Sequence, residues 1–379
     1  MKPTNVLHLV NILGVGGAEG QFVERVRTTD RDRFRPLVAA LQVSGRHVEA
    51  LRAEGIEPVA FPLGPSFAHP TTAWIVARLA AWMRSRDVKL VHAQDFYTNL
   101  LAVPAARIAG AKVIVSRLDL AHWHGSARRL VLALATRAAD RVQVNAMAIT
   151  RQLVEEERID PAKVALVNNG IDLARFDACA DRPLDEPLPI PPGAKVITTI
   201  ANLHPIKGQE DTVRALASLA SAFPSLHLLL VGEGEKRKVI EDCARRLGVA
   251  DRVHLLGHRA DVPAILARSH VLVSSSRAEG LSNSVIEGMA ARLPIVATAV
   301  GGTPELVDGR SRGMLVPARS PERIADAVAR ILSDPELARS LGREARRFAE
   351  RNLGIEVMSR GFDRLYEEVL APKGARARR

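Results

Sequence analysis

Two glutamates, eight residues apart, flank the predicted start of a short helix. An apolar run, residues 270–273, ends in three serines, and Glu279-Gly280-Leu281-Ser282-Asn283 leads from there toward Glu287. A helix start offers backbone N–H groups without intrahelical partners and the positive end of the helix dipole, and both suit a phosphate. Ionised carboxylates only accept hydrogen bonds, whereas sugars are rich in hydroxyl donors. The segment therefore predicts a nucleotide-sugar site.

The same residues allow a purely structural interpretation. Ser284-x-x-Glu287 fits a capping box, in which the glutamate side chain bonds back to the start of its own helix. The segment alone leaves both interpretations open, so its neighbours have to decide between them.

A lysine at the end of another apolar run is the second candidate for chemistry. Lys207 follows residues 196–200 and stands just before a predicted helix. A cation at the carboxyl end of a strand can meet a diphosphate, and one charge-assisted hydrogen bond there contributes about 1.5–3 kcal/mol. The alternative is an ordinary surface lysine.

Glycines and polar residues follow three further strand candidates. Gly16 and Gly17 come after the first apolar run, Gly232 after residues 226–231, and His258 after residues 253–256. Asn202 shares the Lys207 loop. Glycine lets the backbone turn tightly and approach a ligand closely, so these positions are candidate donor contacts. Simple strand-to-helix turns explain them as well, and the spaced glycines of a dinucleotide fold are absent.

A polar cluster follows residues 112–116 in the first half. Arg117, Asp119, His122 and His124 gather there and are candidates to contact an acceptor or the transferred sugar. A plain loop is the alternative. No histidine or cysteine spacing typical of zinc accompanies them, and we expect neither a metal nor a cofactor.

Thirteen short apolar runs alternate with stretches of helical composition and must position these residues. The expected strands are residues 6–11, 36–41, 58–61, 90–93, 112–116, 142–145 and 164–168, then 196–200, 226–231, 253–256, 271–274, 295–298 and 313–316. Continuous apolar strands between helices are typical of parallel sheets covered on both faces, which bind ligands at the carboxyl ends of their strands. We expect two doubly wound α/β domains that face each other across a cleft.

Proline marks the expected boundary between the domains. Positions 183, 187, 189, 191 and 192 are all proline, in a segment without periodicity. We expect an N-terminal domain over residues 1–180, a linker over 181–192 and a C-terminal domain over 193–352. A helix over 353–371 and a basic tail over 372–379 complete the chain.

Composition and charge narrow the classes of function. The 379 residues are 47% hydrophobic and 25% charged, as in soluble globular proteins, and carry a net charge of +11. Residues 1–175 hold 23 Lys and Arg against 16 Asp and Glu. A basic face attracts anionic lipid, although solvated surface charge explains the same excess. Aromatic residues make up only 4%, and no basic run is interleaved with them, so we expect no nucleic acid as partner.

Location follows from two further observations. Cys179 and Cys243 show neither metal spacing nor a disulfide framework, which suits a reducing cytosol. No run of 18 apolar residues occurs, and His8 and Asn11 interrupt the first apolar run, which we interpret as a strand rather than a signal peptide. We expect a cytoplasmic protein that is peripheral on the inner face of the cell membrane.

Taken together, the motifs resemble those of glycosyltransferase family 4, whose members are retaining enzymes with the GT-B fold of two facing Rossmann-like domains. The resemblance covers nearly the whole chain. It rests on the order and spacing of five motifs rather than on any one alone. The motifs are Gly16-Gly17-Ala18-Glu19, Asn169-Gly170-Ile171-Asp172, Pro205-x-Lys207-Gly208, the Glu279…Glu287 pair and Gly301-Gly302-x-Pro304-Glu305.

The resemblance implies roles for the residues. Lys207 would hold the donor diphosphate, Glu279 would lie by the donor sugar, and Glu287 would bind the ribose hydroxyls. The backbone at Gly280 and Leu281, with Ser282 and Asn283, would contact phosphate or sugar. The first domain would be the acceptor side and the second the donor side, with the last helix packing back on the first domain.

Two positions depart from the family pattern. Asn202 stands where members often carry an arginine that shares the diphosphate with the lysine, and Arg117 is one candidate to compensate. Arg117-Leu118-Asp119 stands where members often carry a histidine near the transferred sugar, with His122 and His124 displaced.

The expected reaction is transfer of a sugar, with retention, from a UDP- or GDP-linked donor to a hydroxyl. A lipid-linked or oligosaccharide acceptor in cell-envelope, exopolysaccharide or lipopolysaccharide assembly is expected, with an anionic membrane surface as partner. A sugar-nucleotide epimerase of the same fold is the alternative enzyme. A non-catalytic nucleotide-sugar or nucleic-acid binding protein is the alternative from another class.

Overall fold

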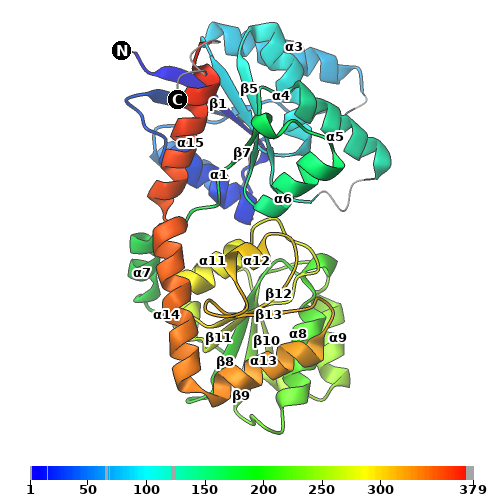
Figure 1. Ribbon diagram of the computed structural model, residues 1–379, viewed down its shortest axis with the longest axis vertical. Coiled ribbons are helices and arrows are strands. Elements are labelled where there is room, and N and C mark those ends of the chain that lie inside the picture. The colour runs from blue at the N-terminus through cyan, green and yellow to red at the C-terminus, as the bar shows by residue number, and fades with distance from the viewer. Residues whose placement is uncertain (1, 15, 65–66, 68, 121–124, 373–379) are drawn as a thin grey trace. The chain divides into compact units, whose positions relative to one another are not determined.

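The computed structural model describes residues 2–14, 16–64, 67, 69–120 and 125–372. The chain divides into two compact units, each with its own parallel sheet (Figure 1). The first unit comprises Met1–Gly170 together with Ile355–Arg379, and the second comprises Ile171–Gly354. None of the described helices is long and apolar enough to cross a membrane.

The first unit is built on a seven-stranded sheet in the order β3-β2-β1-β4-β5-β6-β7. Its strands are β1 (Thr4–Ile12), β2 (Phe34–Gln42), β3 (Val59–Ala60), β4 (Leu90–Ala93), β5 (Lys112–Arg117), β6 (Arg141–Val144) and β7 (Val164–Leu166). Its helices are α1 (Gly17–Arg27), α2 (His47–Ala53), α3 (Thr71–Ser85), α4 (Phe96–Ala109), α5 (Ser126–Ala138), α6 (Met147–Arg151) and α15 (Ile355–Leu370). A π-helical turn, Gln152–Glu156, continues α6, and a 3-10 turn, Pro161–Lys163, precedes β7.

The central strand β1 shows why this unit folds as a covered parallel sheet. Leu7 lies opposite Leu37 of β2 and Val91 of β4, and all pairs are parallel. Val6, Leu7 and Leu9 have no exposed surface, so successive side chains on both faces are covered. A strand buried on both faces has no reason to alternate polar with apolar residues, which is why it appears as an apolar run.

The second unit holds a six-stranded parallel sheet in the order β10-β9-β8-β11-β12-β13. Its strands are β8 (Lys195–Ile200), β9 (Leu226–Val231), β10 (Val253–Gly257), β11 (Val271–Ser274), β12 (Ile295–Thr298) and β13 (Met314–Val316). Its helices are α7 (Leu173–Ala180), α8 (Gln209–Leu219), α9 (Arg237–Arg246), α10 (Val262–Leu266), α11 (Asn283–Ala290), α12 (Thr303–Leu306), α13 (Pro321–Ser333) and α14 (Pro335–Asn352). Two 3-10 turns, Pro205–Lys207 and Ala250–Arg252, precede α8 and β10.

All thirteen expected strands are present, and the doubly wound α/β class is confirmed. The units meet in the chain at Gly170 and Ile171, ahead of residue 180, where we expected the first domain to end. Helix α7 belongs to the second unit because Arg346 of α14 donates to both carboxylate oxygens of Asp177, at 2.8 and 2.7 Å. The proline-rich segment 181–192 contains no helix or strand. Its Leu184 and Leu188 pack against a cluster of buried residues in the second unit that includes Val196 and Leu229.

The Asn169-Gly170-Ile171-Asp172 motif marks this passage between the units. The Gly170 N–H donates to Gln21 Oε1 at 3.0 Å, and a Cβ on Gly170 would lie 2.8 Å from Met358 Cβ. Asp172 caps α7 by accepting from the Arg175 N–H at 2.9 Å. The motif therefore closes the first unit and opens the second.

Helix α15 completes the core of the first unit (Figure 1). Met358, Phe362 and Tyr366 are buried against Val6 of β1 and Leu90 of β4. Along the sequence, the chain thus returns to the first sheet only after it has passed through the whole second unit.

We predict that Phe362→Ala destabilises the first unit by about 3–5 kcal/mol, because it removes a large side chain from a packed core. Urea unfolding followed by circular dichroism should show an earlier transition for that unit. Arg360→Ala is the matched control on the exposed face of α15 and should change stability by less than about 0.5 kcal/mol. Equal midpoints for both variants would contradict the packing of α15 in this core.

Candidate functional site

Lys207 and Glu279 form the centre of the candidate site in the second unit. Lys207 Nζ lies 2.6 Å from Glu279 Oε1, and Ser276 Oγ donates to the same oxygen at 2.6 Å. The lysine side chain is 27% exposed and the glutamate 11%, so the pair is shielded but open to solvent on one side. Lys207 follows β8 and Glu279 follows β11, which are neighbours in the sheet. Two of the predicted residues are thus brought together at the carboxyl edge.

Backbone contacts fix the Lys207 loop against the segment after β11. Ser275 Oγ donates to the Lys207 carbonyl at 3.0 Å, and the Arg277 N–H donates to the Ile206 carbonyl at 2.7 Å. Gly208 has φ +63°, and a Cβ there would lie 2.4 Å from the Ser275 carbonyl oxygen. Glycine is required at this position both for its left-handed conformation and for the close approach.

A second glycine contact supports the Glu279 loop from the other side. Gly301 has φ +52°, and a Cβ there would lie only 1.8 Å from the Glu279 carbonyl oxygen. The Gly302 N–H donates to the Gly280 carbonyl at 2.8 Å. The Gly301-Gly302 motif therefore fixes the backbone on which the Glu279 side chain stands.

Helix α11 begins directly after this loop. Ser282 is its N-cap, and its hydroxyl accepts from the Val285 N–H at 3.4 Å. Gly280 and Leu281 are buried, and Asn283 is half-buried as the first helical residue. Because Ser282 rather than Ser284 caps the helix, the capping-box interpretation of Glu287 does not apply.

Glu287 is therefore not needed to cap its own helix. Burial raises the pKa of its carboxyl to about 7, although part of the residue remains exposed. Within the described chain no hydrogen bond or ion pair stabilises the ionised form. Such a carboxylate gains from any ligand that donates hydroxyl groups to it.

The remaining candidates in the second unit have mainly structural contacts. Gly232 has φ +139°, and a Cβ there would lie 2.2 Å from the Ala201 carbonyl oxygen, so this glycine packs β9 against the loop after β8. Asn202 is exposed, and its carbonyl accepts from Gln209 Nε2 at 2.9 Å. His258 is exposed on the loop after β10.

In the first unit, the glycine turn begins helix α1. Gly16 is the N-cap and Gly17 the first helical residue. A Cβ on Gly16 would lie 2.2 Å from Glu19 Oε2, because the Glu19 side chain folds back over the turn. The carboxylate of the motif thus lies at the carboxyl end of β1.

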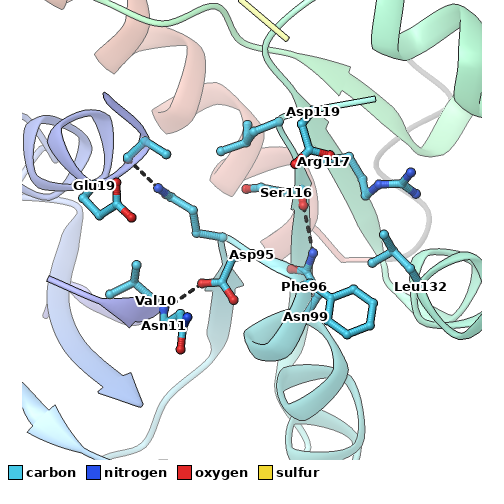
Figure 2. Close-up of a pocket in the computed structure, with 13 residues that line it drawn as sticks. Val10, Asn11, Glu19, Asp95, Phe96, Asn99, Ser116, Arg117, Asp119 and Leu132 are labelled. Atoms are coloured by element: carbon cyan, nitrogen blue, oxygen red, sulfur yellow. Dashed lines mark hydrogen bonds between the residues drawn. The ribbon is translucent and has the colours of Figure 1, made fainter. Parts of the chain in front are cut away.

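Arg117 is buried, and its charge is neutralised within the first unit. Its two terminal nitrogens lie 2.9 and 2.6 Å from the two oxygens of Glu157, and Figure 2 shows its guanidinium turned away from Glu19 and Asp95. The ion pair with Glu157 is a contact that the sequence did not reveal. His122 and His124 lie outside the described residues.

A cavity of about 180 Å³ lies at the carboxyl ends of β1, β4 and β5 (Figure 2). Arg117 and Asp119 line it as sequence-predicted residues, and Glu19 does so as part of the glycine motif. Sequence reasoning missed its other polar residues, which are Asn11, Gln94, Asp95, Asn99 and Ser116. The sequence did contain a signal for them, because most of these residues end or directly follow an apolar run.

Asp95 organises one wall of this cavity. Its carboxylate accepts from the Asn11 N–H at 2.7 Å and from the Thr98 N–H at 3.2 Å, and so joins the end of β1 to the start of α4. Burial raises the pKa of Asp95, while these backbone hydrogen bonds oppose the shift.

The architecture of both units defines a class of fold shared with a solved nucleotide complex. The crystal structure of HepE from Anabaena in complex with UDP matches with a TM-score of 0.82 over 96% of this chain and 100% of that one, at 21% identity. The two parallel sheets and this likeness identify the fold as GT-B.

Two family models then identify the family. The model described as Glycosyltransferase Family 4 matches residues 15–175, and the one described as Glycosyl transferases group 1 matches residues 181–348. The chain belongs to glycosyltransferase family 4, which confirms the resemblance of its motifs.

Curated relatives are named as glycosyltransferases. A D-inositol 3-phosphate glycosyltransferase of Segniliparus rotundus is 32% identical over 54% of this chain and 47% of its own length. A GDP-mannose-dependent phosphatidylinositol monomannoside mannosyltransferase of Mycobacterium tuberculosis is 29% identical over 79% of this chain and 80% of its own. The match spans about half the length of the first relative.

We predict that Glu287 makes the second unit less stable at higher pH. A carboxyl whose pKa rises on folding, here from 4.5 to about 7, costs nothing below pH 4.5, and its destabilising effect is complete above pH 7. The free energy of unfolding of the wild type should therefore fall between pH 5 and pH 8. Glu287→Gln should lessen this fall by about 1–3 kcal/mol, as measured by urea unfolding.

The control for this measurement is Glu322→Gln on the exposed start of α13. Its pH dependence should follow that of the wild type. The prediction is wrong when Glu287→Gln also loses as much stability as the wild type over the same interval.

Proposed function

We propose that the protein transfers a glycosyl group from a nucleoside-diphosphate sugar to a hydroxyl acceptor. The observation that carries this proposal is the 2.6 Å contact between Lys207 and Glu279 at the carboxyl ends of β8 and β11. The family assignment, the solved UDP complex of HepE and the GDP-mannose named for the mycobacterial relative support it.

On binding, the donor diphosphate would replace Glu279 as the partner of Lys207. Lys207 would turn toward the diphosphate, and the backbone from Gly280 to Asn283 with the Ser282 cap would meet phosphate or sugar oxygens at the start of α11. Glu279, released from the lysine, would accept from sugar hydroxyls. Glu287 would bind the ribose, which is the hydroxyl-rich part of the nucleotide.

Gly16, Gly17, Gly232, Asn202 and His258 are further proposed donor contacts. Asn202 is a weak substitute for the arginine that family members often carry at this position, because an amide cannot supply a positive charge. The guanidinium of Arg117 is already bonded to Glu157, so we do not assign it the compensating role. The diphosphate would then rest chiefly on Lys207 and on the helix start.

We propose retention at the anomeric carbon by a front-face reaction. The bond from this carbon to the leaving phosphate oxygen breaks, a bond to the acceptor oxygen forms on the same face, and the acceptor proton passes to the leaving phosphate. Ser276 Oγ donates to Glu279 Oε1, and this bond would persist after Lys207 turns away, which makes the oxygen a poorer nucleophile. Lys207 and the helix start would stabilise the negative charge that develops on the leaving group.

We predict that Lys207→Ala and Glu279→Gln each lower kcat/KM for the donor by about 10²–10³, since each removes a group that contacts the reacting part of the donor. Turnover is measured with UDP-glucose and GDP-mannose, and the anomeric form of the product by NMR. Lys238→Ala on the exposed face of α9 is the matched control and should keep the wild-type rate.

Wild-type rates in both site variants would refute the assignment. Conversion of the donor in the absence of any acceptor would instead indicate the epimerase. Salt-sensitive RNA binding without a response to any nucleotide sugar would indicate the binding protein. No feature of the described residues favours either of these alternatives.

We further propose that helix α5 of the first unit binds an anionic membrane surface and so brings the enzyme to a lipid-linked or oligosaccharide acceptor in envelope glycan assembly. Leu130, Val131 and Leu134 are 60%, 44% and 55% exposed, and Arg128 and Arg129 are exposed beside them. An exposed apolar face flanked by arginines is typical of helices that lie in a membrane interface.

We predict that the double variant Leu130→Gln/Leu134→Gln loses binding to phosphatidylglycerol-containing vesicles by about tenfold or more, since it removes two leucines that would enter the interface. Cosedimentation measures the binding, with phosphatidylcholine vesicles to show the dependence on charge. Leu247→Gln, at an exposed leucine of the second unit, is the control. Equal binding of all three proteins would contradict a role for α5.

A further inference from the structure

The cavity of the first unit presents an excess of hydrogen-bond acceptors. Asn99 is 1% exposed, and its Nδ2 donates to the Ser116 carbonyl at 2.8 Å. A carbonyl can only accept, so this bond fixes the amide orientation and leaves Oδ1 as a buried acceptor without a partner. An unpaired buried acceptor costs free energy until a donor reaches it, and Asn99 lines the cavity.

The charged residues around the cavity have the same preference. Glu19 contributes a carboxylate that has no hydrogen bond or ion pair within the described chain, and Asp119 also lines the cavity. Arg117 is the only described lysine or arginine in the lining, and Glu157 neutralises it. A phosphate or carboxylate placed here would face the Glu19 carboxylate, and no described lysine or arginine of the lining is free to balance that charge.

A buried arginine lies behind the cavity but is not one of the residues that line it. Arg25 lies 3.4 Å from His92 Nε2, and the same His92 nitrogen is 2.9 Å from Ser116 Oγ. Burial lowers the pKa of His92 well below its ordinary value, so the ring between Arg25 and the cavity is neutral. The guanidinium itself packs over the rings of Phe22 and Phe362.

We infer that this cavity binds an uncharged, hydroxyl-rich acceptor group, such as the terminal sugar of a glycan, and rejects phosphorylated or carboxylated acceptors. Hydroxyl groups would donate to Asn99 Oδ1 and to the Glu19 carboxylate. The role of this group as acceptor rests on the proposed transferase function, whereas the charge preference rests on the cavity alone.

Titration of the ¹⁵N-labelled full chain with a matched pair of ligands tests the inference. Methyl α-D-glucopyranoside should shift the side-chain amide signals of Asn99, which are assigned by their absence in Asn99→Ser, and should bind at least about tenfold more tightly than glucose 6-phosphate. Glu19→Gln should narrow this ratio severalfold by weakening the repulsion of the phosphate. Glu155→Gln, exposed elsewhere in the same unit, should leave it unchanged.

Equal or tighter binding of the phosphate ester would overturn the inference. Failure of the glycoside to shift Asn99 at about 100 mM would do so too, because the lining would then bind no polyol even at very weak affinity. UDP and GDP are titrated into the same sample. Glycoside binding without nucleotide binding would leave the charge preference standing and would count against the transferase.

Discussion

The contact between Lys207 and Glu279 depends on backbone segments approaching each other more closely than side chains allow. The two residues are 72 positions apart, yet their charged groups lie 2.6 Å from each other. Gly208 and Gly301 make this possible, because both adopt a positive φ. At either position the Cβ of any other residue would clash with a carbonyl oxygen. The geometry of the ion pair is therefore set by the main chain, and a donor that displaces Lys207 finds the loop already fixed.

The sheets could be predicted from sequence because their physics is local. A parallel strand covered on both faces becomes an apolar run, and each of the thirteen runs formed a strand. The boundary between the units could not be predicted in this way. Proline content marks irregular backbone, but α7 is tied to the second unit by distant contacts such as that between Asp177 and Arg346, which are 169 residues apart. No local pattern carries such a contact.

The same distinction explains the site. Motif glycines and the paired glutamates were visible in the sequence, since a backbone requirement restricts the residue type at one position. The neutralisation of Arg117 was not visible, because Glu157 lies 40 residues away, directly after the π-helical turn that continues α6. The same holds for Glu287, whose capping role depended on which serine ends the loop, and the structure assigns that cap to Ser282.

The candidate sites of the two units differ in charge as the proposed reaction requires. A diphosphate brings negative charge that has to be stabilised when the sugar leaves, and the second unit offers Lys207 and a helix start. The hydroxyl groups of an acceptor are hydrogen-bond donors, and the cavity of the first unit offers oxygen acceptors from Glu19 and Asn99. A cation in that cavity would favour phosphate over hydroxyl, so the ion pair that neutralises Arg117 would contribute to the proposed selectivity without touching a substrate.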